Sequence, residues 1–143
     1  MYKMIAAALV AAGILVASQV PGTAASLVAH VDISSQTMTV SNYGLTVYVW
    51  RVSTARSGYH TPTGSYRPTA LRRMWYSKKY DNSPMPFSVF FRGGYAIHGT
   101  GAVKRLGTPA SHGCVRLHPS NAATLYSMIQ QAGSGNTRIV ITN

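Results

Sequence analysis

The chain has 143 residues, enough for one ordinary domain, and thirteen Lys and Arg against two acidic residues give it a formal net charge of +11. The two acidic residues are Asp32 and Asp81. A pair of catalytic carboxylates, as in glycoside hydrolysis, or an oxygen cage for Ca²⁺ would have almost no groups to draw on. We therefore exclude both kinds of site.

The amino terminus has the organisation of a secretory signal peptide. Lys3 supplies a positive charge, residues 4–18 form an uncharged apolar run, and residues 21–25 add a break and small side chains. The run is shorter than the roughly 20 residues that a membrane-spanning helix needs, which disfavours a permanent anchor. We expect residues 1–25 to be a signal peptide and residues 26–143 to be an exported domain, in the periplasm or cell wall, with no stable membrane insertion after cleavage.

Most of the exported domain has β-strand character. Residues 45–52 are rich in β-branched and aromatic side chains, which favour strands, and short polar turns precede them. A meander of hairpins is the simplest arrangement for such a segment and its neighbours. The basic and aromatic stretch at residues 72–86 is expected to be irregular. The strands expected in chain order are residues 27–33, 37–40, 45–52, 65–68, 87–91, 95–98 and 137–142.

One helix is expected, over residues 121–131. Ala122, Leu125 and Ile129 recur there at helical spacing, Pro119 suits the first turn, and Gly133 provides a stop. The predicted fold class is therefore mainly β: a β-sandwich-like or barrel-like domain with one helix near the C-terminus.

The most reactive side chains of the sequence lie between positions 97 and 117. Cys114 is the only cysteine, so it has no internal disulfide partner, and His98 and His112 lie near it in the sequence. A thiol becomes a strong nucleophile when a neighbouring imidazole accepts its proton. A buried, inert thiol is the alternative for an isolated cysteine. The two nearby histidines favour a nucleophilic site.

Gly113 leaves two arrangements of the cysteine segment open. In an extended segment, the side chains of His112 and Cys114 would point to the same face, whereas a tight turn would aim backbone N–H groups there. The N–H groups of Gly113 and Cys114 are then candidates for an oxyanion hole.

A catalytic imidazole usually has its second ring nitrogen held by a third group. Only Asp32 and Asp81 could supply a carboxylate for this purpose. We predict instead that a backbone carbonyl, that of Gly99, orients His98.

At these residues the chain resembles the L,D-transpeptidase catalytic domain family. The Ser-His-Gly-Cys core at residues 111–114, followed by Arg116 and preceded by His98, matches the signature of that family. Residues 61–64 (Thr-Pro-Thr-Gly) and 94–99 are similar to other parts of it. The resemblance covers most of the exported domain.

The resemblance implies an enzyme that acts on peptidoglycan tetrapeptide stems. Cys114 would attack the carbonyl after diaminopimelate, release D-Ala and retain the stem as a thioester, with His98 as general base and acid. An amine of a second stem would then form a bond between two diaminopimelate residues. Water as the acceptor would make the enzyme an L,D-carboxypeptidase. No cofactor and no metal are implied.

The resemblance also implies roles for the residues around the nucleophile. His112 is expected to contribute to catalysis, and Ser111, Gly113, Arg116 and Gly99 to an oxyanion or substrate-binding site. Gly99 stands where members of the family carry Ser, which removes a hydroxyl and leaves only the backbone to assist.

Other functions compete with this one. Zinc bound by His98, His112, Cys114 and His118 would lack an established ligand spacing, and His118 is better placed to cap the helix. The basic, aromatic residues 72–80 could form a platform for single-stranded nucleic acid, but export argues against a nucleic-acid partner. A non-catalytic, basic cell-wall-binding protein stays open. In either wall-associated role, the positive charge is expected to attract anionic cell-envelope polymers.

Overall fold

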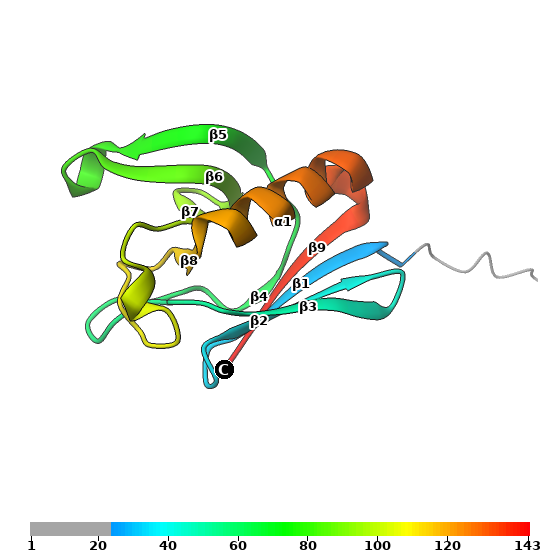
Figure 1. The fold of residues 1–143 in the computed structure, drawn as a ribbon, viewed down its shortest axis with the longest axis horizontal. Coiled ribbons are helices and arrows are strands. Elements are labelled where there is room, and N and C mark those ends of the chain that lie inside the picture. Colours follow the sequence, from blue (N-terminus) through cyan, green and yellow to red (C-terminus); the bar gives the residue numbers. More distant parts are fainter. Residues whose placement is uncertain (1–23) are drawn as a thin grey trace, which may run out of the picture.

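The structure is a computed structural model that describes residues 24–143. The predicted signal peptide at residues 1–25 falls, except for its last two positions, outside the described residues. The described part contains two mixed β-sheets and one α-helix (Figure 1). Within residues 24–143, no helix is long and apolar enough to cross a membrane.

The first sheet has five strands in the order β3-β2-β1-β9-β4. Strands β1 to β3 form the expected antiparallel meander, and β9 pairs with β1 in parallel, so the two ends of the domain lie side by side. Alternate residues of β1 (Leu27, Ala29 and Val31) are buried, as the two-residue period of a half-buried strand requires. The strands are β1 (Leu27–Asp32), β2 (Thr37–Asn42), β3 (Leu45–Arg51), β4 (Gly64–Tyr66) and β9 (Thr137–Thr142).

The second sheet has four strands in the order β5-β6-β7-β8. Its first three strands are antiparallel, and β8 pairs with β7 in parallel. A parallel pair needs a long connection, and here residues 100–114 provide it, with the short 3₁₀ helix η2 (Val103–Arg105) on the way. The strands are β5 (Ala70–Ser77), β6 (Ser83–Arg92), β7 (Tyr95–Gly99) and β8 (Val115–Leu117).

The expectation that residues 72–86 are irregular was wrong, because β5 and β6 form a long hairpin there. The 3₁₀ helix η1 (Lys78–Tyr80) makes its tip, followed by Asp81 and Asn82 in the left-handed region with φ values of 55° and 52°. Both faces of β5 are largely exposed, so the strand lacks the alternation of apolar and polar residues that identifies a half-buried strand in a sequence.

The predicted helix is confirmed as α1 (Pro119–Ala132), and a second short helix, η3 (Ser134–Asn136), follows it. The buried residues of α1 are Ala122, Leu125 and Ile129, and this helix packs against β6, β7 and β1. Figure 1 shows α1 between the β5–β6 hairpin and the five-stranded sheet. The hydrophobic core fills the space between these layers.

The mainly β class is confirmed, but the barrel-like alternative was wrong. The two sheets keep separate strand orders and do not close on one another. Isolated bridges join Ser53 to Arg116 and Ala55 to Ser111, so the segment after β3 lies beside the cysteine segment.

Candidate active site

The parallel pairing of β7 with β8 brings His98 and the cysteine segment together. Ile97 is paired with Val115 and His98 with Arg116. Ile97 and Val115 belong to the core, and successive residues of a strand face opposite sides, so His98 points away from the core on the side that Arg116 shares. Cys114 directly precedes Val115, and its sulfur contacts the backbone of Ala96, two residues before His98. The thiol and the imidazole therefore belong to neighbouring segments of one sheet.

His98 is held in one orientation by its own strand. The ring is 6% exposed, and its Nδ1 lies 2.7 Å from the carbonyl oxygen of Gly99. Burial lowers the pKa of His98 to about 4, with a further lowering by Arg116 and an opposing effect of the Gly99 carbonyl. The ring is therefore neutral at pH 7. Since a carbonyl only accepts hydrogen bonds, Nδ1 carries the proton and Nε2 has a free lone pair.

The prediction that the Gly99 carbonyl orients His98 is thus confirmed. Gly99 is itself buried, and a Cβ there would lie 3.1 Å from both Pro119 Cα and Pro86 Cγ, so the residue fixes the imidazole and has no free surface for a substrate. The expected substrate-binding role of Gly99 is corrected accordingly.

Cys114 is a free, partly exposed cysteine. Burial raises the pKa of its thiol above the ordinary value, while the hydrogen bond from the Ala96 backbone and the charge of Arg116 lower it. The Sγ atom also lies 3.9 Å from the carbonyl oxygen of Gly94. With a neutral imidazole and a thiol whose pKa is raised, the site at rest holds no thiolate–imidazolium pair. Nucleophilic attack then requires removal of the thiol proton during the reaction.

Ser111 and Gly113 shape the turn that carries Cys114. Ser111 is fully buried, and its hydroxyl donates to the carbonyl oxygen of Cys114 at 2.6 Å and accepts from the N–H of Gly113 at 3.0 Å. Thr61 donates to the carbonyl oxygen of Gly113 at 2.9 Å. Two expectations are corrected: Ser111 has no exposed surface for substrate, and the Gly113 N–H is already engaged. The N–H of Cys114 remains the candidate donor for an oxyanion hole.

Of the two arrangements left open at Gly113, the turn is the one found. Its φ of +135° is strained for residues with a side chain. A Cβ at this position would lie 2.6 Å from Cε1 of Tyr95 and 2.8 Å from the carbonyl oxygen of His60. The glycine lets the segments of His60, Tyr95 and Cys114 pack closely together.

Gly113→Ala is therefore expected to destabilise the protein by about 3 kcal/mol, from backbone strain and steric overlap with a carbonyl oxygen. The free energy of unfolding in urea measures the loss. Gly135→Ala is the matched control, because a Cβ there would meet nothing within 4 Å. Equal stability of the two variants would contradict the steric account of Gly113.

His112 lies between two tyrosine rings. Its ring stacks on Tyr80 from the hairpin tip, with ring centroids 3.9 Å apart and planes 13° apart. Tyr59 meets it edge-on at 4.8 Å. Burial, then the charges of Arg56, Arg116 and Lys79, lower the pKa of His112. The sequence analysis did not predict the two tyrosines near this site. They lie far from Cys114 in the chain, and no motif connects them with it.

Arg116 is half-buried near Cys114. One Nη atom donates to the carbonyl oxygen of Ala110 at 3.3 Å, so the guanidinium braces the loop before Cys114. Burial lowers the pKa of Arg116, as do the charges of Arg56 and Arg105, whereas Cys114 raises it. The side chain thus stabilises the loop through Ala110 and also interacts electrostatically with Cys114.

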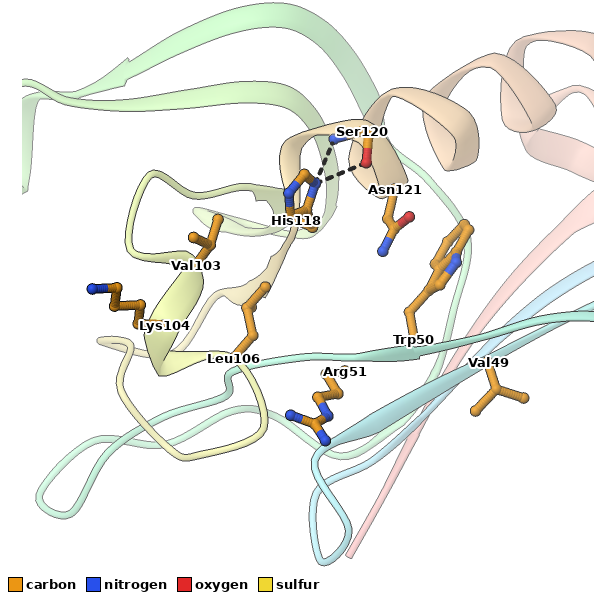
Figure 2. A pocket seen from close by; sticks show the side chains of 9 residues that line it. All are labelled: Val49, Trp50, Arg51, Val103, Lys104, Leu106, His118, Ser120 and Asn121. Atoms are coloured by element: carbon orange, nitrogen blue, oxygen red, sulfur yellow. Dashed lines mark hydrogen bonds between the residues drawn. The ribbon is translucent and has the colours of Figure 1, made fainter.

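His118 takes the structural role expected of it. Its Nδ1 lies 3.2 Å from the Ser120 N–H and 2.7 Å from the Ser120 hydroxyl, which caps the start of α1 (Figure 2). The four proposed zinc ligands do not gather: residues 24–143 hold no group of three or more His, Cys, Asp or Glu side chains arranged to bind a metal ion. The zinc alternative has no geometric support.

A cavity of about 570 Å³ lies beside this cap, between the end of β3, the η2 loop and the start of α1 (Figure 2). Trp50, Arg51 and Lys104 are among its lining residues, and Cys114 is not. This cavity is thus separate from the cysteine segment.

Several solved structures have a fold similar to that of this chain. An L,D-transpeptidase from Mycobacterium smegmatis matches with a TM-score of 0.74 and 23% identity over 82% of this chain and 59% of the other. An L,D-transpeptidase from Stackebrandtia nassauensis matches with a TM-score of 0.72 and 28% identity over 82% and 56%. L,D-transpeptidase 3 from Mycobacterium tuberculosis, in complex with a faropenem-derived adduct, gives 0.70 and 24% over 82% and 60%.

This chain spans about three fifths of the length of these solved chains. No curated protein sequence matches it significantly. Residues 26–141 match the model of a protein family, YkuD, described as the L,D-transpeptidase catalytic domain. That match covers most of the chain, and it includes β7, the cysteine turn and β8. The chain therefore belongs to the YkuD family of L,D-transpeptidase catalytic domains.

Proposed function

We propose that the protein is a cysteine-dependent L,D-transpeptidase, an acyltransferase that acts on peptidoglycan tetrapeptide stems. The observation that carries the proposal is the state of His98: the Gly99 carbonyl holds Nδ1, and the neutral ring keeps Nε2 free beside the segment of the single cysteine. Membership of the YkuD family supports the choice of substrate.

The first half-reaction forms a thioester. His98 Nε2 takes the proton of the Cys114 thiol as the sulfur attacks the carbonyl between diaminopimelate and D-Ala. The oxyanion that forms is stabilised by the N–H of Cys114, the backbone donor of the turn that is proposed for this role. The imidazolium then returns its proton to the departing nitrogen, so that D-Ala leaves as a free amine and the stem stays on the sulfur.

The second half-reaction decides the product. The amine of a second stem attacks the thioester, His98 takes its proton, and the restored thiol leaves, which gives a diaminopimelate-to-diaminopimelate cross-link. Water in place of the amine gives an L,D-carboxypeptidase, and other amines give other transfer products. A non-catalytic cell-wall-binding protein is the further alternative.

The proposal includes export. Residues 1–25 have the pattern of a signal peptide, and we propose that residues 26–143 act as the mature domain in the periplasm or cell wall. Without Lys3 the mature domain has a formal net charge of +10, which would concentrate it on anionic envelope polymers and on the carboxylates of the stems.

Two measurements on the purified protein test the chemistry. Incubation with faropenem, the source of the adduct in the solved mycobacterial relative, is expected to add one adduct mass, located at Cys114 by peptide mapping. Incubation with disaccharide-tetrapeptides is expected to release D-Ala and to yield either cross-linked dimers or tripeptides, distinguished by mass. An unmodified thiol together with unchanged stems would leave the binding-only function in place of the enzyme.

A further inference from the structure

Three cationic side chains gather around the aromatic cage that Tyr59 and Tyr80 form at His112. The Arg56 guanidinium lies 5.0 Å from the centroid of the Tyr59 ring, and the Lys79 ammonium lies 5.5 Å from that of Tyr80. The two tyrosines in turn hold His112 between them. Arg56 and Lys79 therefore stand at opposite ends of one continuous row of contacts.

Arg116 joins this group from β8. It is the register partner of His98, and it lies close enough to Arg56 for the charge of Arg56 to lower the pKa of Arg116. The positive charges of Arg56, Lys79 and Arg116 all lower the pKa of His112. We call these three residues the cationic rim.

The described chain offers the rim no carboxylate partner. Asp32 is engaged by the N–H groups of Ser34 and Ser35 and by the Ser34 hydroxyl, within the β1–β2 turn. Asp81 follows Tyr80 on the exposed hairpin tip, but it is not among the groups that act electrostatically on His112 or Arg116.

Arg56 and Lys79 are exposed and Arg116 is half-buried, and cations that repel one another are stabilised by an anion that enters from outside. Because Arg116 lies close enough to Cys114 for the two groups to interact, that anion would belong to the molecule that reaches the thiol. A guanidinium binds a carboxylate through paired, charge-assisted hydrogen bonds, which also fix its orientation.

We propose that the cationic rim is a carboxylate subsite, and that Arg56, with Lys79, selects donor stems whose side-chain carboxyl groups are free over stems whose carboxyl groups are amidated. This inference rests on the proposed function, since it assigns the substrate preference of the same site. The carboxylate comes from the isoglutamate residue or from the second carboxyl group of diaminopimelate, and the chemistry of recognition is the same for both.

The Cys114→Ala variant allows binding to be measured without turnover. Four disaccharide-tetrapeptides are titrated into it by calorimetry: the carboxyl groups of isoglutamate and diaminopimelate are both free, either one is amidated, or both are amidated, and the D-Ala carboxylate is free in all four. We expect the fully free stem to bind about tenfold more tightly than the doubly amidated stem, because the free carboxylate makes charge-assisted hydrogen bonds that the amide does not. The two singly amidated stems show which carboxyl group the rim engages.

Adding Arg56→Gln or Lys79→Gln to this background is expected to reduce that preference by about three- to fivefold and to leave the affinity for the doubly amidated stem unchanged. Arg56→Lys should restore part of it. Lys78→Gln is the matched control, because it removes the same charge from the neighbouring position but Lys78 does not act on His112.

Equal affinities for free and amidated stems, no binding of any stem, or an equal loss with Lys78→Gln would overturn the subsite. Turnover by the unmodified protein is followed separately. Turnover without a carboxylate preference removes the subsite and keeps the enzyme, whereas a carboxylate preference without turnover keeps the subsite and removes the enzyme.

Discussion

Replacement of Cys114 by Ala is expected to reduce stem turnover by at least about 10⁴-fold, because no other side chain of the chain can form the thioester. Cys114→Ser should be nearly as inactive. A neutral hydroxyl is a weaker nucleophile than a thiol, and the site has only one neutral imidazole to activate it. Release of D-Ala from tetrapeptides, followed by mass spectrometry, measures both variants.

The fold should tolerate these changes. The sulfur is partly exposed, and its contact with the Gly94 carbonyl is long, at 3.9 Å. Thermal unfolding within a few degrees of the parent protein is the control. A well-folded Cys114→Ala variant that still releases D-Ala at more than about one per cent of the parent rate would exclude the thioester route.

His98→Gln is expected to slow acylation of Cys114 by about 10³-fold, the usual contribution of a general base. The glutamine amide lies at about the reach of Nε2, so the substitution removes the base together with the contact of Nδ1 with the Gly99 carbonyl. The rate of faropenem adduct formation under single-turnover conditions measures the effect. A change of less than about tenfold would show that another group takes the thiol proton.

The same residue sets the acid limit of the reaction. Only the neutral imidazole accepts a proton, and burial lowers the pKa of His98 to about 4. The rate should therefore hold from neutral pH down to about pH 5 and fall as the pH drops through about 4. An ordinary histidine would lose its activity near pH 6.5.

The pH profile of adduct formation distinguishes these two cases, with circular dichroism at each pH to show that the protein stays folded. An acid limb near pH 6.5 would mean that the imidazole is hydrated when the site works, contrary to its burial in the structure.

The interpretation of the cysteine segment depended on a small set of reactive residues. The chain has a single cysteine and two carboxylates, so the sequence leaves few combinations of nucleophile, base and orienting group. This scarcity is why the Gly99 carbonyl, and no aspartate, could be predicted as the partner of His98. The helix and most strands were equally accessible, because their apolar residues repeat with the period of the element they form.

The β5–β6 hairpin escaped prediction for the opposite reason. Its first strand is exposed on both faces, so pairing with β6 holds it in place and no apolar period marks it. The hairpin carries Tyr80 and Lys79 to the cysteine segment, and the cage around His112 depends on it. A polar, aromatic stretch that looked irregular in the sequence thus forms one wall of the site.

The sequence by itself predicted Cys114 and His98 as the reactive pair, and it determined the mainly β class and the carbonyl that holds His98 in place of a carboxylate, since each follows from residue type or local period. Only the tertiary structure decided that Ser111 and the Gly113 N–H bind each other and that Arg56 and Lys79 converge on His112. Hydrogen bonds between backbone and side chain depend on the conformation of a turn, and contacts across the fold depend on strand pairing and register. Neither these hydrogen bonds nor these contacts produce a repeating pattern in the sequence from which they could be predicted.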